Sequence, residues 1–398
     1  MAPDAPVVRK SRPGQPGSQS ALRQLNRTRI TEALASGGPA TQAELSRITG
    51  LSTATVSNIV KSMLGDGLVT VEPTTSSGRR AVSVALDGHG AIAVGIDFGR
   101  THVRVVLATV GHQIVAEDSV RLPLGHHAEE GIAAAAELLE RLLAQANVSR
   151  RSIVGAGAGI PGPIDSRSGT VVQGAILPEW VGINLLDRLE EALDLPVFAD
   201  NDSNLGALAQ VTWGPHAAVS NLMFLKIGSG IGSGLILNGA PYYGHVGVTG
   251  EIGHATINEH GHVCRCGNRG CLETVASTAI MIELLSRGAP RPVGVGEIVE
   301  RALAGDAATL RVVEDAGLAV GRAIGNVANL INPEVIVVGG PLAGLGELLL
   351  APIRRGLLRH AVPLVGETTV LVMSSMGDRA EVLGAASLVF QQHGIRRS

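Results

Sequence analysis

The sequence of 398 residues contains only three cysteines, and Phe, Trp and Tyr together make up 2% of it. An odd, small number of cysteines argues against a disulfide framework and indicates a reducing compartment. No uncharged apolar run reaches the roughly 18 to 20 residues that a membrane-spanning helix needs. Residues 1–20 also lack the continuous apolar segment of a secretory signal. We therefore expect a cytoplasmic protein that does not contact membranes.

The net charge of -3 is small, but the charges are unevenly distributed. Residues 1–80 carry ten Lys and Arg against five Asp and Glu, a balance of +5, and the remainder carries 22 against 30, a balance of -8. A basic head on an acidic body indicates a nucleic-acid contact at one end of the chain. The apolar content of 45% is enough for the cores of two or three domains.

Residues 1–18 are rich in Pro, Gly, Ser and Arg and show little hydrophobic periodicity, which predicts a disordered basic tail. Its cations could contact phosphates, or the tail could simply be solvated. From residue 19 the apolar residues recur at helical spacing and stop before a Gly-Gly-Pro sequence. The apolar positions of this first helix are Leu22, Leu25, Ile30 and Leu34.

Two further helices follow within 41–65. Thr41 and Glu44 have the spacing of a capping box, and Gly50 is placed to end that second helix. Its expected buried face consists of Ala43, Leu45 and Ile48. Ser52 is expected to cap the third helix, whose expected buried face consists of Val56, Ile59, Val60, Met63 and Leu64. Short hydrogen-bonding side chains and one cation occupy the outer face, namely Thr53, Thr55, Ser57, Asn58 and Lys61.

A short turn between two such helices is typical of a helix-turn-helix whose second helix enters the major groove of DNA. Alternating residues at 68–71 and 81–86 then predict a hairpin, so that residues 19–86 form a winged helix-turn-helix. Arg79 and Arg80 lie near the tip of this wing, where arginine binds the minor groove or phosphate. The alternative is a three-helix protein-binding domain with a solvated hairpin.

From residue 91 the pattern becomes α/β. An apolar strand at 91–96 leads into D-F-G-R-T at 97–101, and two apolar strands at 222–239 are joined by G-S-G-I-G-S-G. Glycine-rich turns of this kind bring backbone amides close to an anion.

All three cysteines lie within residues 251–273. Cys264, Cys266 and Cys271 form a C-x-C-x4-C pattern with glycines that allow tight turns. A structural Zn²⁺ needs four ligands, and the segment offers three histidines, His254, His260 and His262, among which spacing alone cannot choose. The alternative is that the cysteines are buried small hydrophobic residues.

The blocks G-E-I-G-H, ending at His254, and C-R-C-G-N-R-G-C-L-E, ending at Glu273, resemble the signature of the ROK family of sugar kinases and sugar-responsive repressors. The resemblance runs from about residue 91 to 390. It implies a two-lobed, actin-like (ribonuclease H-like, sugar kinase-type) ATPase fold behind the winged helix-turn-helix. The first lobe would comprise 91–200 with the C-terminal helix 378–393, and the second lobe 201–377.

The resemblance also implies the site residues. It favours His254 as the fourth zinc ligand and implies a sugar site formed by Asn201, Asp202, Glu251, His254 and Glu273. In the family's kinases, the residue that matches Asp202 accepts the proton of the attacking hydroxyl. If nucleotide binds, the matching phosphate contacts are Asp97, Gly99, Thr101, Gly228, Gly230 and Gly232. Arg100 and Pro341 depart from the kinase pattern, which commonly has glycine at both positions.

Two functions follow from these observations. The first is a repressor of carbohydrate genes that binds a pseudo-palindromic operator as a homodimer or homotetramer, with structural zinc and a sugar or sugar phosphate as effector. The second is an ATP- and Mg²⁺-dependent sugar kinase of the glucokinase type, with Asp202 as general base. A third alternative is a protein that is both a repressor and a sugar kinase.

Overall fold

The computed structural model describes residues 22–23, 26–27, 29–31, 33–34, 38–65, 68–76, 79–86, 91–165, 169–172, 176–245, 247–287 and 291–393. The expected basic tail at 1–18 lies outside these residues. The chain divides into two compact units, one ending at Gly90 and one spanning Ala91–Val389, and residues from Phe390 onward are grouped with the first. Among the described helices, none has the length and apolar character required to cross a membrane.

The first unit is a small helical domain with a three-stranded sheet of order β1-β3-β2. The described residues between 22 and 34 are helical. The remaining elements are β1 (Ala40–Thr41), α2 (Gln42–Thr49), α3 (Thr53–Gly65), β2 (Val69–Ser76) and β3 (Arg79–Leu86). Both strands of the hairpin are longer than their alternation predicted, because the polar residues before and after the turn also pair.

The predicted start and end of α2 are confirmed. The Thr41 backbone donates to Glu44 Oε2 at 2.7 Å, and Thr41 Oγ1 accepts from the Glu44 backbone at 3.3 Å. Gly50 ends the helix with φ of 70°, a left-handed conformation that glycine adopts without strain. Ser52 Oγ accepts from the Thr55 backbone at 3.2 Å and so caps α3 as predicted.

Three predicted core positions of the helix pair are wrong. Ala43, Ile48 and Leu64 are exposed, whereas Leu45 and Met63 are fully buried. Successive helical residues differ by about 100°. Ala43 therefore lies roughly opposite Leu45, and Leu64 turns away from the face that carries Met63. In helices of two or three turns, apolar composition alone does not define the buried side.

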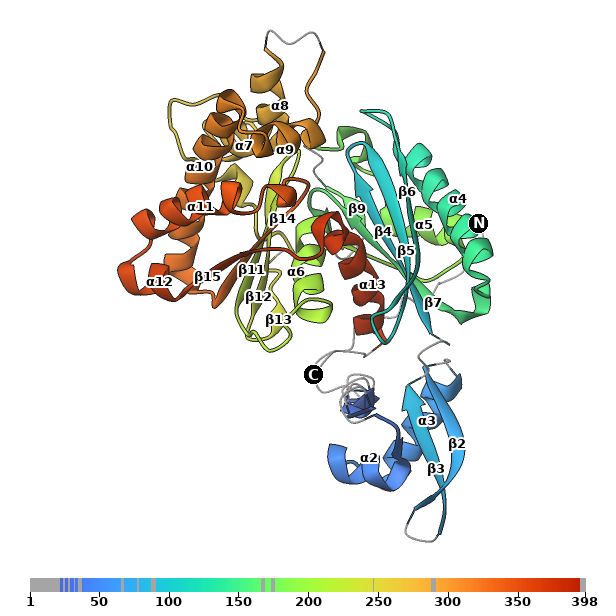
Figure 1. Ribbon diagram of the computed structural model, residues 1–398. Helices are drawn as coiled ribbons and strands as arrows, with labels where there is room; N and C mark the ends of the chain where they lie inside the picture. The colour runs from blue at the N-terminus through green and yellow to red at the C-terminus, as the bar shows by residue number, and fades with distance from the viewer. Residues whose placement is uncertain are drawn as a thin grey trace, which may run out of the picture. The chain divides into compact units, whose positions relative to one another are not determined.

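The second unit contains two five-stranded sheets, each with helices against it (Figure 1). The first sheet has the order β10-β7-β4-β5-β6, in which β10, β7 and β4 are parallel, β5 is antiparallel to β4, and β6 is antiparallel to β5. Its elements are β4 (Ile92–Gly99), β5 (His102–Thr109), β6 (Ile114–Arg121), α4 (Ala128–Ala146), β7 (Ile153–Ile160), α5 (Leu185–Leu193) and β10 (Val197–Asn201). A separate two-stranded sheet consists of β8 (Ile164–Asp165) and β9 (Thr170–Val171), which lie between β7 and α5 in the sequence.

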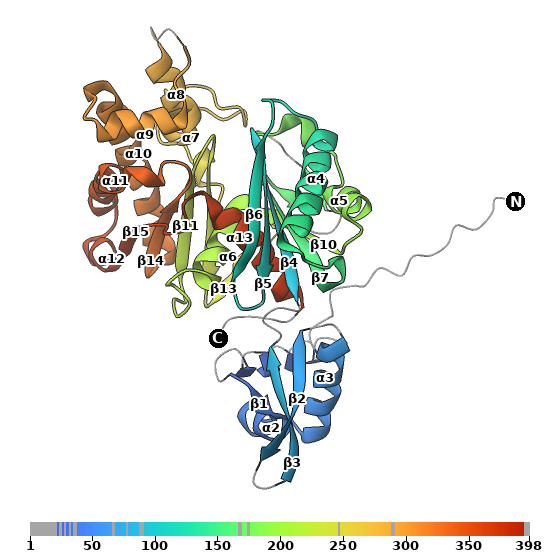
Figure 2. The ribbon, with the colours of Figure 1, turned by 45° about the vertical axis from the view of Figure 1, so that its right-hand side comes forward.

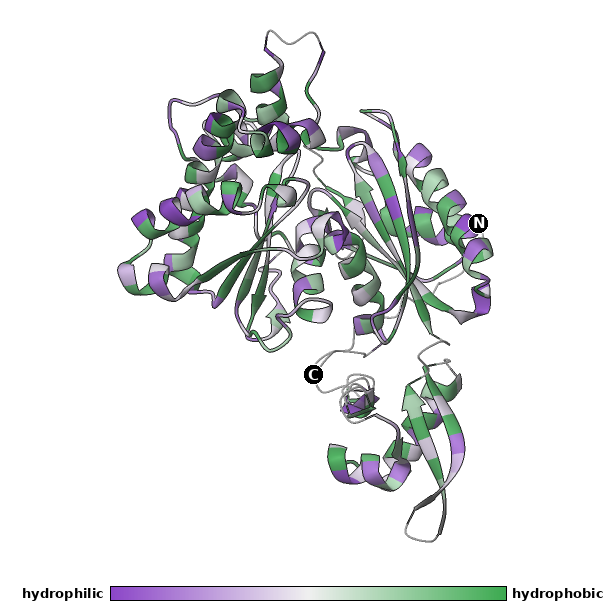
Figure 3. Ribbon diagram, in the orientation of Figure 1, coloured by the Kyte–Doolittle hydropathy of each residue, from purple (hydrophilic) through white to green (hydrophobic). Residues whose placement is uncertain are grey.

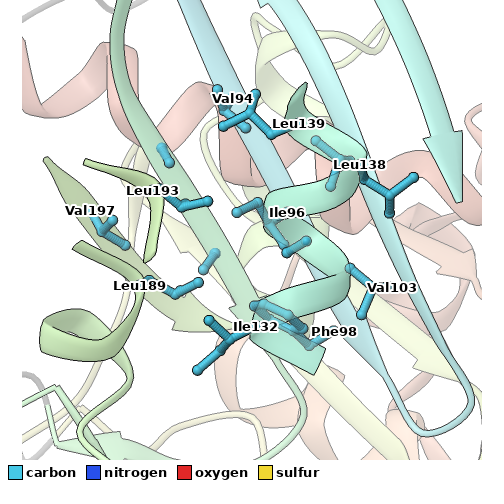
Figure 4. Packing of buried hydrophobic residues seen from close by; sticks show 14 of the residues in the cluster. Val94, Ile96, Phe98, Val103, Ile132, Leu138, Leu139, Leu189, Leu193 and Val197 are labelled. Carbon is cyan, nitrogen blue, oxygen red and sulfur yellow. The ribbon is translucent and has the colours of Figure 1, made fainter. Parts of the chain in front are cut away.

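One face of this first sheet packs against α4 and α5. Figure 4 shows the side chains of Ile96 and Phe98 pointing toward Ile132 and Leu139 of α4, with Leu189 of α5 close by. All of these belong to one buried cluster. The buried face of α4 therefore covers the central strand β4 of this sheet.

The second sheet has the order β13-β12-β11-β14-β15. Its strands are β11 (Leu222–Ile227), β12 (Ile231–Leu237), β13 (Ala240–Pro241), β14 (Val335–Gly339) and β15 (Val370–Met373). The helices of this lobe are α7 (Glu273–Ala276), α8 (Thr278–Ser286), α9 (Val295–Leu303), α10 (Ala307–Ile331), α11 (Glu347–His360) and α12 (Pro363–Thr368). Figure 3 shows that β11 and β14 are mostly hydrophobic, as expected for strands covered on both faces.

Two helices, α6 (Asp202–Thr212) and α13 (Ala380–Gln392), lie between the sheets in both views (Figures 1 and 2). Glycines permit this close packing. A Cβ on Gly157 of β7 would lie 1.9 Å from the backbone oxygen of Ala385, and one on Gly384 would lie 1.9 Å from that of Leu205. The two sheets therefore meet through α6 and α13, whose N-terminal ends carry charged residues discussed below.

Replacing Gly157 with alanine is expected to lower the free energy of unfolding by about 1 to 3 kcal/mol, because α13 must move away from β7 to admit the methyl group. Urea denaturation of the two proteins measures the difference. Gly296→Ala is the control, since a Cβ there meets nothing within 4 Å and the position is inside α9. Alanine should leave stability unchanged or raise it at that position. Equal stability of Gly157→Ala and wild type would contradict the packing argument.

Candidate ligand and metal site

A cavity of about 820 Å³ lies within the second unit, a size typical of small-molecule sites. Its walls come from the β4–β5 turn, the start of α6, the β11–β12 turn and the cysteine-containing segment. All five residues predicted to bind sugar line it, namely Asn201, Asp202, Glu251, His254 and Glu273. Ligand crevices in α/β proteins commonly form where strands end, and Asn201 and Asp202 follow β10 directly.

Beside this cavity, His254 and the three cysteines converge. Their ligand atoms all lie within 4.8 Å of one another. His254 Nδ1 is 3.6 Å from Cys264 Sγ, and Cys266 Sγ is 3.8 Å from Cys271 Sγ. With zinc–sulfur bonds of about 2.3 Å, a tetrahedral site requires neighbouring sulfurs about 3.8 Å apart. These four residues therefore fit a structural Zn²⁺.

The local backbone explains the convergence. Gly267 and Gly270 have φ of 94° and 67°, and a Cβ on Gly270 would lie 1.6 Å from the Asn258 oxygen. Only glycine fits there. His260 and His262 are exposed and lie outside the group of four. Burial raises the pKa of the Cys264 and Cys271 thiols, so forming the thiolates requires the positive charge that a bound metal would supply.

The two ring nitrogens of His254 face different partners. Nδ1 faces Cys264, whereas Nε2 lies 3.7 Å from Glu251 Oε2. His254 therefore joins the metal group to the cavity, and fixing its ring orientation also fixes a polar atom on the cavity wall. Burial raises the pKa of Glu251, which is the acidic side chain of this wall with the most solvent access.

Glu273 is held by a basic neighbour that the sequence did not point to. Arg265 donates from Nε to Glu273 Oε1 at 3.1 Å and from Nη2 to Oε2 at 2.8 Å. Burial opposes ionisation of Glu273, but these hydrogen bonds outweigh it and lower its pKa. Both carboxylate oxygens are therefore engaged, and a ligand would contact Glu273 and Arg265 as a pair.

Asn201 and Asp202 are also engaged. Asn201 caps α6, because its Oδ1 accepts from the Ser203 and Asn204 backbones at 2.9 and 3.4 Å, and its Nδ2 donates to Gly162 O. The Asn201 side chain therefore has a structural role at the start of α6 as well as a place in the cavity wall. Asp202 Oδ2 accepts from Lys226 Nζ at 2.8 Å.

The predicted phosphate contacts divide into two groups. Those lining the cavity are Gly99, Thr101, Gly228, Gly230 and Gly232, and Arg100 and Pro341 line it as well. Asp97 is 3% exposed and is not part of the lining. His102 Nε2 lies 3.0 Å from Asp97 Oδ2. Burial opposes ionisation of Asp97, but the bond to His102 and the charge of Lys226 lower its pKa.

On the winged helix-turn-helix, the predicted DNA contacts share one exposed face of α3. Thr53, Ser57, Asn58 and Lys61 are exposed there, and Ala54 belongs to the same face. Thr55 is half-buried and bonds Ser52, so it contributes to the cap. The side chains of Arg79 and Arg80 lie outside what the structure describes.

Comparison with known proteins agrees with this architecture. A ROK family model matches residues 93–392, which is most of the chain. The chain belongs to the ROK family. A MarR family model matches residues 25–80 of this ROK protein, the winged helix region. The expected fold class, a winged helix-turn-helix followed by an actin-like two-sheet body, is confirmed.

Three relatives show how far the similarity extends. The ROK protein is 29% identical to a putative xylose repressor of Caldicellulosiruptor sp., covering 94% of this chain and 97% of the repressor. A glucokinase of Halalkalibacterium halodurans is 33% identical but covers 75% of this chain and 95% of the kinase. The crystal structure of a ROK family transcriptional regulator, a homolog of the E. coli MLC protein, matches with a TM-score of 0.79 at 27% identity, covering 94% of this chain and 97% of that one.

Proposed function

We propose that this ROK protein is a sugar-responsive transcriptional repressor of carbohydrate genes. The observation that carries the proposal is the extent of similarity: repressors match 94% of the chain, including the winged helix region, whereas the glucokinase matches 75%. The exposed polar face of α3 supports it, because such side chains read base edges in the major groove.

In this proposal the winged helix-turn-helix spans 19–86, and two copies in a homodimer or homotetramer bind a pseudo-palindromic operator. Sugar hydroxyls would meet Glu251, His254 Nε2 and the Glu273–Arg265 pair in the cavity. Zinc would hold His254, Cys264, Cys266 and Cys271 together and so shape this wall. The sugar would change DNA affinity only by as much as it prefers one state of the protein over the other.

The second candidate is an ATP-dependent sugar kinase. The 33% identity to a glucokinase and the cavity-lining glycines of both phosphate turns support it. The pairing of Asp202 with Lys226 argues against it, because a general base must be available to accept a proton.

The test is fluorescence anisotropy of the zinc-loaded full chain with DNA from its own promoter region, with and without xylose, glucose and their phosphates. We expect sequence-specific, salt-dependent binding that one of these ligands alters at least about tenfold, which corresponds to a coupling of about 1.4 kcal/mol. Binding no tighter than to random DNA, together with sugar phosphorylation from ATP, would instead establish the kinase.

A further inference from the structure

Lys226 is the one charged residue in β11, a strand of sequence L-M-F-L-K-I. Its Nζ lies 2.8 Å from Asp202 Oδ2 and 3.2 Å from Glu381 Oε1. Asp202 begins α6 and Glu381 lies in the first turn of α13, so three elements from both lobes meet at this ammonium group. The Lys226 side chain is 21% exposed and forms part of the cavity wall.

The surroundings of Lys226 are strongly acidic. The side chains of Asp97, Asp202 and Glu381 are all below 10% exposed, and each acts electrostatically on Lys226. Burial alone would lower the pKa of Lys226, but these carboxylates raise it well above its usual value, so it remains charged. Burial also raises the pKa of Glu381. Three carboxylates buried together require a cation.

In proteins, such clusters of carboxylate oxygens hold divalent cations. We propose that Lys226 is a built-in counter-ion that takes the place of a divalent metal in this pocket and keeps Asp202 from acting as a base. The pocket then binds its ligand without metal and without nucleotide. The choice of a sugar as ligand rests on the function proposed above, whereas the exclusion of metal rests on the contacts within this pocket.

A kinase reaction in this pocket would require Asp202 to accept the proton of the sugar hydroxyl. In phosphoryl transfer from ATP, a sugar oxygen attacks the γ-phosphorus, the hydroxyl proton passes to the carboxylate base, and ADP leaves with the electron pair of the broken P–O bond. Asp202 Oδ2 already holds the Lys226 ammonium, and Oδ1 accepts from Ser203 Oγ at 3.2 Å. Both oxygens of Asp202 are therefore already hydrogen-bond acceptors for groups of the protein itself. Asp202 can still accept a hydrogen bond from a bound hydroxyl and so position it.

A second contact supports the same reading. Asp97, one of the phosphate contacts that the family resemblance implies, is bonded at Oδ2 by His102. Within the described residues its other oxygen, Oδ1, has no hydrogen-bond partner and is buried, 3.8 Å from the position of a Cβ on Gly159. His102, which bonds Asp97, lines the cavity, whereas Asp97 itself does not.

The experiment uses the zinc-loaded full chain and Mn²⁺, a paramagnetic divalent probe. Free Mn²⁺ is counted by electron paramagnetic resonance while it is titrated into wild type, Lys226→Met and Lys226→Arg. We expect Lys226→Met, which retains the length but loses the charge, to bind one Mn²⁺ at least about tenfold more tightly than wild type. Lys226→Arg restores the cation and should bind as weakly as wild type. Arg311→Met on the exposed side of α10 removes a charge elsewhere and should change nothing.

Equal Mn²⁺ affinity of Lys226→Met and wild type would overturn the proposal. If Lys226→Met does not fold, the same measurements on the wild-type protein test the proposal. Tight Mn²⁺ binding by wild type, or ATP-dependent phosphorylation of any ligand that it binds, would overturn the proposal. Ligand binding that is unaffected by Mg²⁺ and ATP would support it. Failure to bind promoter DNA would contradict the repressor function and leave these results unchanged, so the two failures are distinguishable.

Discussion

Replacing Cys271 with serine is expected to remove the bound metal and the ligand response together. Cys271 is fully buried, and its sulfur lies 3.8 Å from Cys266 Sγ within the group that includes His254. Serine offers a weaker ligand for zinc than a thiolate. Without metal, His254 is no longer fixed, and we expect sugar affinity to fall about 10- to 100-fold. Elemental analysis measures the zinc content, and calorimetry with the effector sugar measures the affinity.

The neighbouring histidines provide matched controls. His260→Ala and His262→Ala change imidazoles of the same segment that are exposed and outside the ligand group, so zinc content and sugar affinity should remain those of wild type. Zinc retained at one equivalent in Cys271→Ser with unchanged sugar affinity would show that these four residues are not the ligands. Loss of zinc in His262→Ala would point to a different fourth ligand.

The zinc group illustrates what the sequence could and could not predict. The cysteine spacing and its glycines are local features, and they predicted that the three cysteines converge in a group that could hold a metal ion. Spacing left three histidines open, because His254 is ten residues before Cys264 and its approach depends on the fold of the intervening loop. The family resemblance favoured His254, and the structure places it with the cysteines.

The ion pairs that Lys226 and Arg265 form with buried carboxylates could not be predicted from local sequence patterns. Lys226 meets Asp202 and Glu381 only because β11, α6 and α13 pack together, and no local pattern specifies that packing. One signal was present: a single lysine in a strand otherwise apolar must have a buried partner. Arg265 gave less indication, since an arginine in an irregular loop is usually solvated.

The start of α6 is a boundary that hydrophobic periodicity does not reveal, because its first residues are polar and buried. Asp202, Ser203 and Asn204 are each less than 10% exposed and form the first turn of α6, although their composition is typical of a loop. The Asn201 cap and the bond from Asn204 to Asp200 satisfy these polar groups inside the protein. Periodicity therefore identified strands of both units, and it gives no signal for a helix start at which side-chain hydrogen bonds replace apolar contact.

Replacing Asn58 with alanine is expected to weaken binding to the operator about 10- to 100-fold and to reduce discrimination against other sequences. Asn58 is exposed on α3 beside Ser57, and an asparagine amide can bond an adenine through two hydrogen bonds worth about 1 to 3 kcal/mol. Anisotropy titrations with the operator and with a scrambled DNA of equal length measure both quantities. Affinity for scrambled DNA should remain that of wild type.

Lys61, one turn further along the same face, should behave differently, and the contrast tests how α3 meets DNA. A lysine that contacts phosphate carries no sequence information, so Lys61→Ala should weaken operator and scrambled DNA alike and reduce the slope of log affinity against log salt by about one. Arg311→Ala, which removes one cation from the exposed side of α10, is the control for net charge and should leave both titrations unchanged. If Asn58→Ala and Lys61→Ala lower both affinities equally, α3 lies along the backbone and another element reads the bases. If neither variant has an effect, the DNA contact is made elsewhere in the chain.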